Sequence, residues 1–141
     1  MSAVQVRLQR TGAARFEASN SAGNLATIEG SPDLGGEGKG VRPMELLLMS
    51  LAGCSSLDVI HILELKQGEK LEALEIVVDG ERADAVPAVY TKIHVRFDAK
   101  GQVDRHKLER AVKLSMEKYC SVTRMLEPTC AITSSVTLNG L

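Results

Sequence analysis

Two cysteines, Cys54 and Cys120, are the side chains of this sequence that could carry out redox chemistry. They lie 66 residues apart, each in a segment with a helical pattern. Thiols that a fold brings together form a redox couple, because a sulfenic acid on one sulfur condenses with the other to a disulfide. Thiols that stay apart are small core residues, since free cysteine is among the most buried residue types. The residues alone leave both interpretations open.

The position of each thiol along its element affects its reactivity. Cys54 lies in the middle of a predicted helix, so it gains little from the helix dipole and needs a nearby cation to become a thiolate. Cys120 lies just before a predicted short helix, which is a better position for a thiolate. Cys130 begins an alternating strand, so we expect a core residue there. An odd number of cysteines favours free or reactive thiols over a disulfide framework.

The composition predicts a soluble protein with one domain over residues 1–141. Its net charge of −1 and its 44% hydrophobic content argue against nucleic acid or an anionic membrane as a partner. With two Tyr, two Phe and no Trp, platforms for base stacking are also absent from the sequence pattern. The N-terminus, Met1 to Arg10, is charged and lacks an apolar core, so we expect no signal peptide and a cytoplasmic location.

The apolar run from Met44 to Leu63 approaches the length of a membrane span. Glu45, Asp58 and His61 interrupt it, so a buried helix explains it better and no membrane is expected. The first half of this helix has no polar stripe. It should therefore be surrounded on most sides, by a sheet or by a second subunit.

The glycine-rich segment Gly35–Gly40 resembles the phosphate-binding P-loop motif in composition. That motif needs Ser or Thr after its lysine, whereas Gly40 follows Lys39 here, and Asp33 occupies the place of the first glycine. The spacing of the dinucleotide-binding fingerprint fails as well. We expect a flexible lid or connection and no nucleotide.

No metal or cofactor site is evident in the sequence pattern. His61, His94 and His106 share no ligand spacing with the cysteines, and no Cys-x-x-Cys pair occurs. We therefore expect neither a metal ion nor a bound cofactor.

Apolar periodicity and turn residues divide the chain into strands and helices that must position these side chains. The predicted strands occupy residues 3–10, 13–19, 25–28, 74–78, 89–97 and 130–138. The predicted helices occupy residues 43–67 and 108–119, with Asp104 as an N-cap of the second, and a short helix from Ser121 to before Pro128. The order βββ-α-ββ-α-(α)-β predicts an α+β fold with a mostly antiparallel sheet.

The segments around the two thiols carry a resemblance to a known family. They are GVRPMELLL at Gly40–Leu48 running into AGC at Ala52–Cys54, and EKYCSV at Glu117–Val122. On these motifs and on its element order, the chain resembles the OsmC/Ohr family of osmotically inducible and organic hydroperoxide resistance proteins, over essentially its full length. The resemblance implies a sheet wrapped around two central helices, and an intertwined homodimer with two sites at the subunit interface.

The same resemblance implies a thiol peroxidase that acts on organic hydroperoxides. In the family, the cysteine equivalent to Cys54 attacks the O–O bond and becomes a sulfenic acid. The cysteine equivalent to Cys120 then condenses with it to a disulfide, which an external dithiol reduces; in the Ohr branch this reductant is lipoyl-linked. No other cofactor is implied.

The sequence departs from the family pattern at the acid that accompanies the reactive thiol. Hydroperoxidases of the family carry Glu directly after the motif proline, where this chain has Met44; its acid is Glu45, nine residues before Cys54. One helical step turns a side chain by about 100° and nine residues span roughly 13.5 Å. Glu45 would then reach a thiol only from the partner chain, or it serves the helix dipole. The family also holds the thiolate with an Arg, for which Arg15 is the first candidate and Arg42 an alternative.

Because of this displaced acid, the chain resembles a divergent OsmC-like branch, with weak peroxidase activity or a different substrate. The alternative function is a non-catalytic dimer that binds a small apolar molecule in the cleft between subunits. The Leu- and Met-rich first helix and the substitution at Met44 motivate that alternative.

Overall fold

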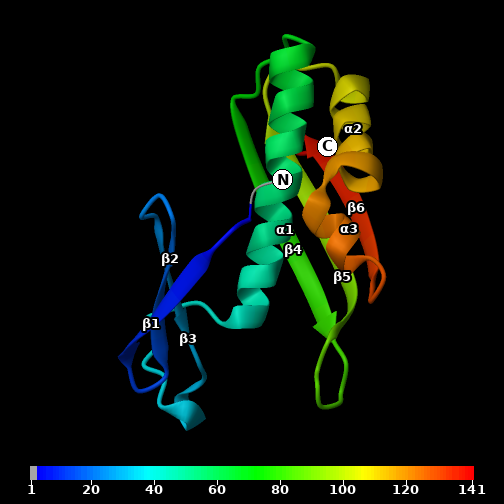
Figure 1. Cartoon of the computed structure of the whole chain (residues 1–141). Helices are drawn as coiled ribbons and strands as arrows, with labels where there is room; N and C mark the ends of the chain where they lie inside the picture. Colours follow the sequence, from blue (N-terminus) through cyan, green and yellow to red (C-terminus); the bar gives the residue numbers. More distant parts are fainter. Residues whose placement is uncertain (1–2) are drawn as a thin grey trace. The chain divides into compact units, whose positions relative to one another are not determined.

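The structure, a computed structural model, describes residues 3–141 and forms two compact units (Figure 1). The N-terminal unit ends at Leu47, and the C-terminal unit spans Leu48–Leu141. Each unit contains one three-stranded sheet. The architecture is α+β, as predicted, with the strands divided between these two sheets.

The sheet of the N-terminal unit is an antiparallel meander in the order β1-β2-β3. Its strands are β1 (Val6–Gly12), β2 (Arg15–Asn20) and β3 (Leu25–Glu29). The turn between β2 and β3 forms because the Asn20 side-chain oxygen accepts hydrogen bonds from the N–H groups of Ala22 and Asn24. All three strands lie where the sequence predicts them, with ends that differ by a few residues.

The glycine-rich segment after β3 and after a short 3₁₀ helix, η1 (Pro32–Leu34), wraps around a carboxylate of its own chain. The N–H groups of Glu37, Lys39 and Gly40 donate to Glu29 at 2.9, 2.6 and 3.1 Å, and Glu29 is only 1% exposed. Gly36 is required, because a Cβ there would collide with the carbonyl oxygen of Gly30. The segment is thus a connection held by hydrogen bonds rather than a flexible lid.

The sheet of the C-terminal unit has the order β4-β5-β6, with strands Ala73–Arg82, Tyr90–Lys100 and Ala131–Leu138. β4 and β5 are antiparallel, whereas β6 lies parallel to β5. A parallel partner requires a crossover connection, which the helices between β5 and β6 provide. On β5 the alternation predicted from the sequence is confirmed, since one face is buried through Ile93, Val95, Phe97 and Ala99.

Three helical segments complete the fold, and two of them end in π-helical turns. Their parts are α1 (Pro43–Ile60) with η2 (His61–Lys66), α2 (Arg105–Leu114) with η3 (Ser115–Tyr119), and α3 (Ser121–Leu126). The predicted N-cap is confirmed, because Asp104 accepts a hydrogen bond from the Lys107 N–H at 2.9 Å. Gly68, with φ +70°, follows the end of the first helical segment.

The core of the C-terminal unit lies between its helices and one face of its sheet (Figure 1). The helices contribute side chains that are 0–3% exposed: Leu51, Val59, Leu63, Leu108, Ala111 and Val112. These pack with the buried face of β5, so that the helices hold their polar residues at fixed positions above the sheet.

The first helix is less enclosed than its composition predicts. Leu51, Ser55 and Val59 form a buried stripe, whereas Met49, Leu57 and Leu65 are 51, 67 and 75% exposed. By length and composition the continuous helix Pro43–Lys66 could cross a membrane, a property that core helices of soluble proteins share. Within the C-terminal unit, the part of this helix from Leu48 onward is therefore covered on one side only.

Candidate functional site

The C-terminal unit brings the two thiols of interest together. Cys54 lies on α1, and Cys120 lies at the junction between η3 and α3. The Sγ atoms of Cys54 and Cys120 and a carboxylate oxygen of Asp58 all lie within 4.8 Å of one another. The interpretation in which the two sulfurs occupy separate cores is therefore wrong.

The two sulfurs differ in their access to solvent. Cys54 is partly exposed, whereas Cys120 is buried, with 3% of its surface exposed. A molecule that arrives from solution therefore reaches Cys54 more readily than Cys120. Cys130 is also buried, its pKa is raised by burial, and its thiol donates to the Leu126 carbonyl at 3.5 Å. Cys130 is thus a core residue, as expected.

Cys120 is the N-cap of α3, which begins at Ser121 as the sequence predicts. Its Sγ accepts a hydrogen bond from the Thr123 N–H at 3.4 Å, and its own N–H donates to the Ser115 carbonyl at 2.8 Å. Burial raises the pKa of the Cys120 thiol, the hydrogen bond from Thr123 opposes this shift, and the nearby Cys54 sulfur adds to it. Cys120 is accordingly a neutral thiol near neutral pH.

Asp58 is a site residue that sequence reasoning mentions only as an interruption of an apolar run. It follows Cys54 by four residues, so both side chains project from one face of α1. The Ser115 hydroxyl donates to Asp58 Oδ2 at 2.9 Å, and Ser115 is fully buried. The spacing of four on a helix is the signal that could have identified Asp58.

The hydroxyl of Ser115 also fixes the distance between the two helices. It lies 3.3 Å from the Ser55 carbonyl oxygen, and Ser55 is fully buried as well, with its own hydroxyl donating to the Leu51 carbonyl at 2.8 Å. These polar contacts tie α1 to η3 within an otherwise apolar core. The helix that carries Cys54 is therefore held against the segment that leads to Cys120.

This arrangement can support acid–base and thiol chemistry. A carboxylate within a few ångströms of a thiol can accept its proton, and the same negative charge disfavours a free thiolate. The three side chains also offer donor types that zinc accepts, sulfur and carboxylate oxygen. The two thiols are the nucleophilic groups of this cluster.

The two arginine candidates both have partners in the N-terminal unit. Arg15 Nη1 lies 3.4 Å from Glu37 Oε1 and 3.6 Å from Glu29 Oε2. Arg42 Nη1 donates to the Gly30 carbonyl at 2.7 Å. Both guanidinium groups therefore stabilise the connection after β3. A role for either toward Cys54 stays a prediction.

Glu45 has a contact that explains its position at the start of α1. Its Oε1 accepts a hydrogen bond from the Arg42 N–H at 2.8 Å, three residues earlier. This is the backward half of a capping box, and an acid in the first turn also suits the helix dipole. The helix-start interpretation of Glu45 is confirmed, whereas a role toward a thiol of a partner chain stays a prediction.

The sequence is similar to those of known proteins. The model of the family described as OsmC-like protein matches residues 36–135. Protein YhfA of Escherichia coli K12 is 33% identical over 133 residues, which cover 94% of this chain and 96% of that protein. Both thiols and Asp58 lie inside the matched family segment.

Solved structures share the fold. A hypothetical protein from Aquifex aeolicus VF5 is 38% identical, covers 99% of both chains and has a TM-score of 0.82. A protein of Legionella pneumophila described as an organic hydroperoxide resistance protein OsmC is 16% identical, covers 97% of this chain and 98% of its own, and has a TM-score of 0.69. At that identity the second likeness shows the fold alone.

Proposed function

Because the chain belongs to the family of OsmC-like proteins, we propose that it is a thiol-dependent peroxidase that reduces organic hydroperoxides. The family includes hydroperoxide resistance proteins. The observation that carries the proposal is the pairing of a partly exposed Cys54 with a buried Cys120 within 4.8 Å. An accessible thiol suits the attack on peroxide, and a sheltered second thiol suits the resolving step.

In the proposed reaction the Cys54 thiolate attacks one peroxide oxygen and the O–O bond breaks. The leaving alkoxide takes a proton and departs as an alcohol, and Cys54 becomes a sulfenic acid. The Cys120 thiol then attacks the sulfenic sulfur, which forms the S–S bond and releases water. An external dithiol returns both thiols by exchange and is itself oxidised to a disulfide; a lipoyl-linked dithiol is the candidate reductant.

Asp58 has a defined role in this proposal. Its carboxylate accepts the proton of the Cys54 thiol, which forms the attacking thiolate, and it then returns that proton to the alkoxide. This assignment supplies an acid close to the thiols. It replaces the family's acid, because the position directly after the motif proline holds Met44 in this chain. The hydrogen bond from Ser115 supports the role, because it orients the carboxylate without neutralising it.

The decisive experiment is mass spectrometry of the purified protein after one equivalent of cumene hydroperoxide. We expect a Cys54–Cys120 link, turnover of peroxide when a dithiol is added, and no turnover in Cys54→Ser. Cys130→Ser is the matched control, because it removes a buried thiol outside the pair. No consumption of several organic hydroperoxides and no link after oxidation would refute the proposal.

A homodimer is part of the proposal, and OsmC-like proteins are typically homodimers. The exposed apolar side chains Met49, Leu57 and Leu65 support it, because a second copy would remove them from water. They also support a second candidate, a non-catalytic dimer that binds an apolar molecule. Two results together would favour that candidate: the wild type has no peroxidase activity, and a Cys54→Ser/Cys120→Ser protein still binds an apolar ligand. We propose a cytoplasmic location for either function.

A further inference from the structure

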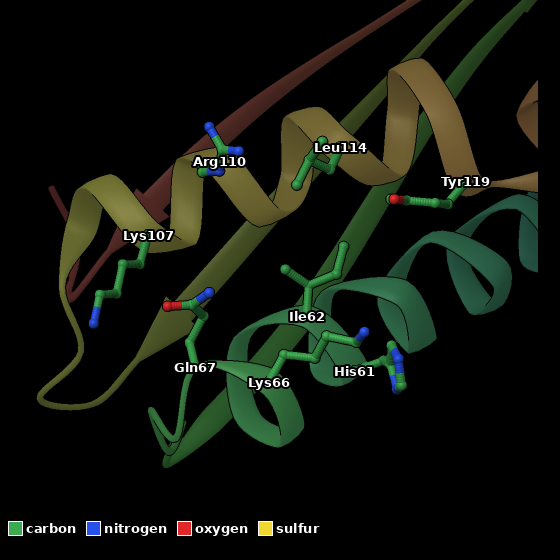
Figure 2. Close-up of a pocket in the computed structure, with 8 residues that line it drawn as sticks. All are labelled: His61, Ile62, Lys66, Gln67, Lys107, Arg110, Leu114 and Tyr119. Atoms are coloured by element: carbon green, nitrogen blue, oxygen red, sulfur yellow. The ribbon is translucent and has the colours of Figure 1, made fainter.

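A pocket of about 470 Å³ opens in the C-terminal unit between η2 and α2 (Figure 2). Cationic side chains come from both of its walls: Lys66 from η2, and Lys107 and Arg110 from α2. No Asp or Glu is among its lining residues. The pocket thus collects positive charge on a chain whose overall net charge is −1.

Most of this positive charge is not cancelled by ion pairs. Lys107 Nζ lies 3.5 Å from Glu69 Oε1 and shares its charge with that acid. Within residues 3–141, neither Lys66 nor Arg110 forms a salt bridge. Two cations on facing helical segments therefore remain for an anion, and a guanidinium is well suited to hold a carboxylate through two hydrogen bonds.

The remainder of the pocket is apolar enough to take more than an inorganic ion. Ile62 and Leu114 face each other across it, and the Tyr119 ring enters from η3 (Figure 2). A pocket with a few placed charges and an apolar lining is typical of sites for organic molecules. The complementary ligand is an amphiphile with one anionic end.

The pocket lies on the same two helical segments as the thiol pair. Ile62 follows Asp58 by one helical turn, and Tyr119 directly precedes Cys120. Ile62 is eight residues from Cys54, which corresponds to roughly 12 Å along a helix. A ligand whose anionic end contacts Lys66 or Arg110 would therefore lay its apolar chain beside Ile62, Leu114 and Tyr119, toward the sulfurs.

We propose that this pocket is a binding site for the carboxylate end of an apolar chain, and that it selects anionic over neutral hydroperoxides. The selection rests on the peroxidase function proposed above, whereas the carboxylate site itself does not. The cations of the pocket would bind the anionic end of the ligand. Its apolar chain would contact Ile62, Leu114 and Tyr119. The thiols act at a distance from the charged end, so the pocket positions substrate and takes no part in bond breaking.

The binding test uses decanoate and its uncharged methyl ester with the full-length Cys54→Ser protein, which cannot turn over peroxide. Isothermal titration at low ionic strength should show that decanoate binds at least about tenfold more tightly than the ester, since hydrogen bonds to charged groups contribute about that much. The added substitutions Lys66→Gln and Arg110→Gln should together remove this preference and leave ester binding unchanged. Lys113→Gln is the matched control, an exposed cation of α2 outside the pocket.

Equal affinity for acid and ester would overturn the proposal, and so would an equal loss of decanoate binding in Lys113→Gln. The turnover test compares linoleic acid hydroperoxide with its methyl ester, which carries the same peroxide on the same chain. The acid should have the lower KM in the wild type but not in the Lys66→Gln/Arg110→Gln protein. Selective binding without any turnover would refute the peroxidase and leave the carboxylate site standing; turnover without charge selection would do the reverse.

Discussion

Ser115 donates its hydroxyl hydrogen to Asp58 at 2.9 Å and thereby joins the helix of Cys54 to the segment that leads to Cys120. Ser115→Ala should cost about 1.5–3 kcal/mol of unfolding free energy, because it removes a hydrogen bond to a charged group at a buried position. Urea unfolding measures this loss. Ser56→Ala is the control, since the Ser56 hydroxyl is exposed and donates to the Gly53 carbonyl within the same helix, α1. Equal losses in both variants would contradict the structural role of Ser115.

Asp58→Asn should slow the oxidation of Cys54 by peroxide near neutral pH, because an amide cannot take the thiol proton. The difference from wild type should shrink as the pH rises, because hydroxide and buffer bases then replace the carboxylate as proton acceptors. Stopped-flow measurement of a single turnover between about pH 6 and 9 tests both statements. A variant faster than wild type over this range would mean that Asp58 acts only as a repelling charge.

The three thiols should react with iodoacetamide in a fixed order, with Cys54 first. Only Cys54 is partly exposed, and the thiolate is the reactive form. Burial raises the pKa of both Cys120 and Cys130 above the ordinary 9.0. At any given pH, a smaller fraction of these two thiols is therefore ionised than of an ordinary cysteine. Peptide mass spectrometry after short pulses at rising pH reads out the order. Labelling of Cys120 as early as Cys54 would contradict the proposed division of roles.

The carboxylate of Glu29 should make stability depend on pH in the acid range. Its pKa lies below its ordinary 4.5, chiefly because the Glu37 N–H bonds to the charged form, with further support from Lys39 N–H and the Arg15 guanidinium. A lowered pKa stabilises the fold above pH 4.5, and this contribution is lost as the pH falls through the lower folded value.

The matched variants for this prediction are Glu29→Gln and Glu17→Gln, the second on an exposed position of β2. Glu29→Gln should be less stable than wild type at neutral pH, and the gap should narrow on acidification. Thermal unfolding monitored by circular dichroism at several pH values measures the gap. A gap independent of pH would show that Glu29 contributes by packing alone.

Much of the fold is accessible from the sequence because its signals are local. Alternation marks β4 and β5, and Arg42-Pro43 and Gly68 mark the ends of the first helical segment. The parallel direction of β6 is not accessible in this way, because a period of two is the same in both directions. The π-helical turns likewise leave no distinct apolar period in a short segment.

The sequence identifies the two cysteines of the site, because their motifs are local, but it does not give the contacts between segments that lie far apart in the chain. Cys54 and Cys120 were identified by motif, but their proximity depends on the packing of α1 against η3, which no local pattern encodes. Asp58 is not distinguished by the sequence, because an acid within an apolar run first argues against a membrane span rather than for a site. Arg15 is a candidate by resemblance, whereas Glu45 is the nearest acid to the family position that Met44 occupies. Their contacts, with Glu29 and with the Arg42 N–H, are structural ones.

The π-helical turn η3 makes the thiol site sensitive to chain length. This turn ends with the hydrogen bond from the Cys120 N–H to the carbonyl of Ser115, five residues earlier, and so it accommodates one residue more than an α-helical turn. Deletion of a single residue from Ser115–Tyr119 would convert the π-turn to an α-helical turn, and the cysteine would still follow the Ser115 carbonyl by one turn. Deletion of a second residue would exceed this allowance, and would rotate the cysteine by about 100° away from the face that meets Cys54. Homologues with a gap of one residue at this turn should therefore keep the paired thiols, whereas those with longer gaps should lose the pairing even where both cysteines align.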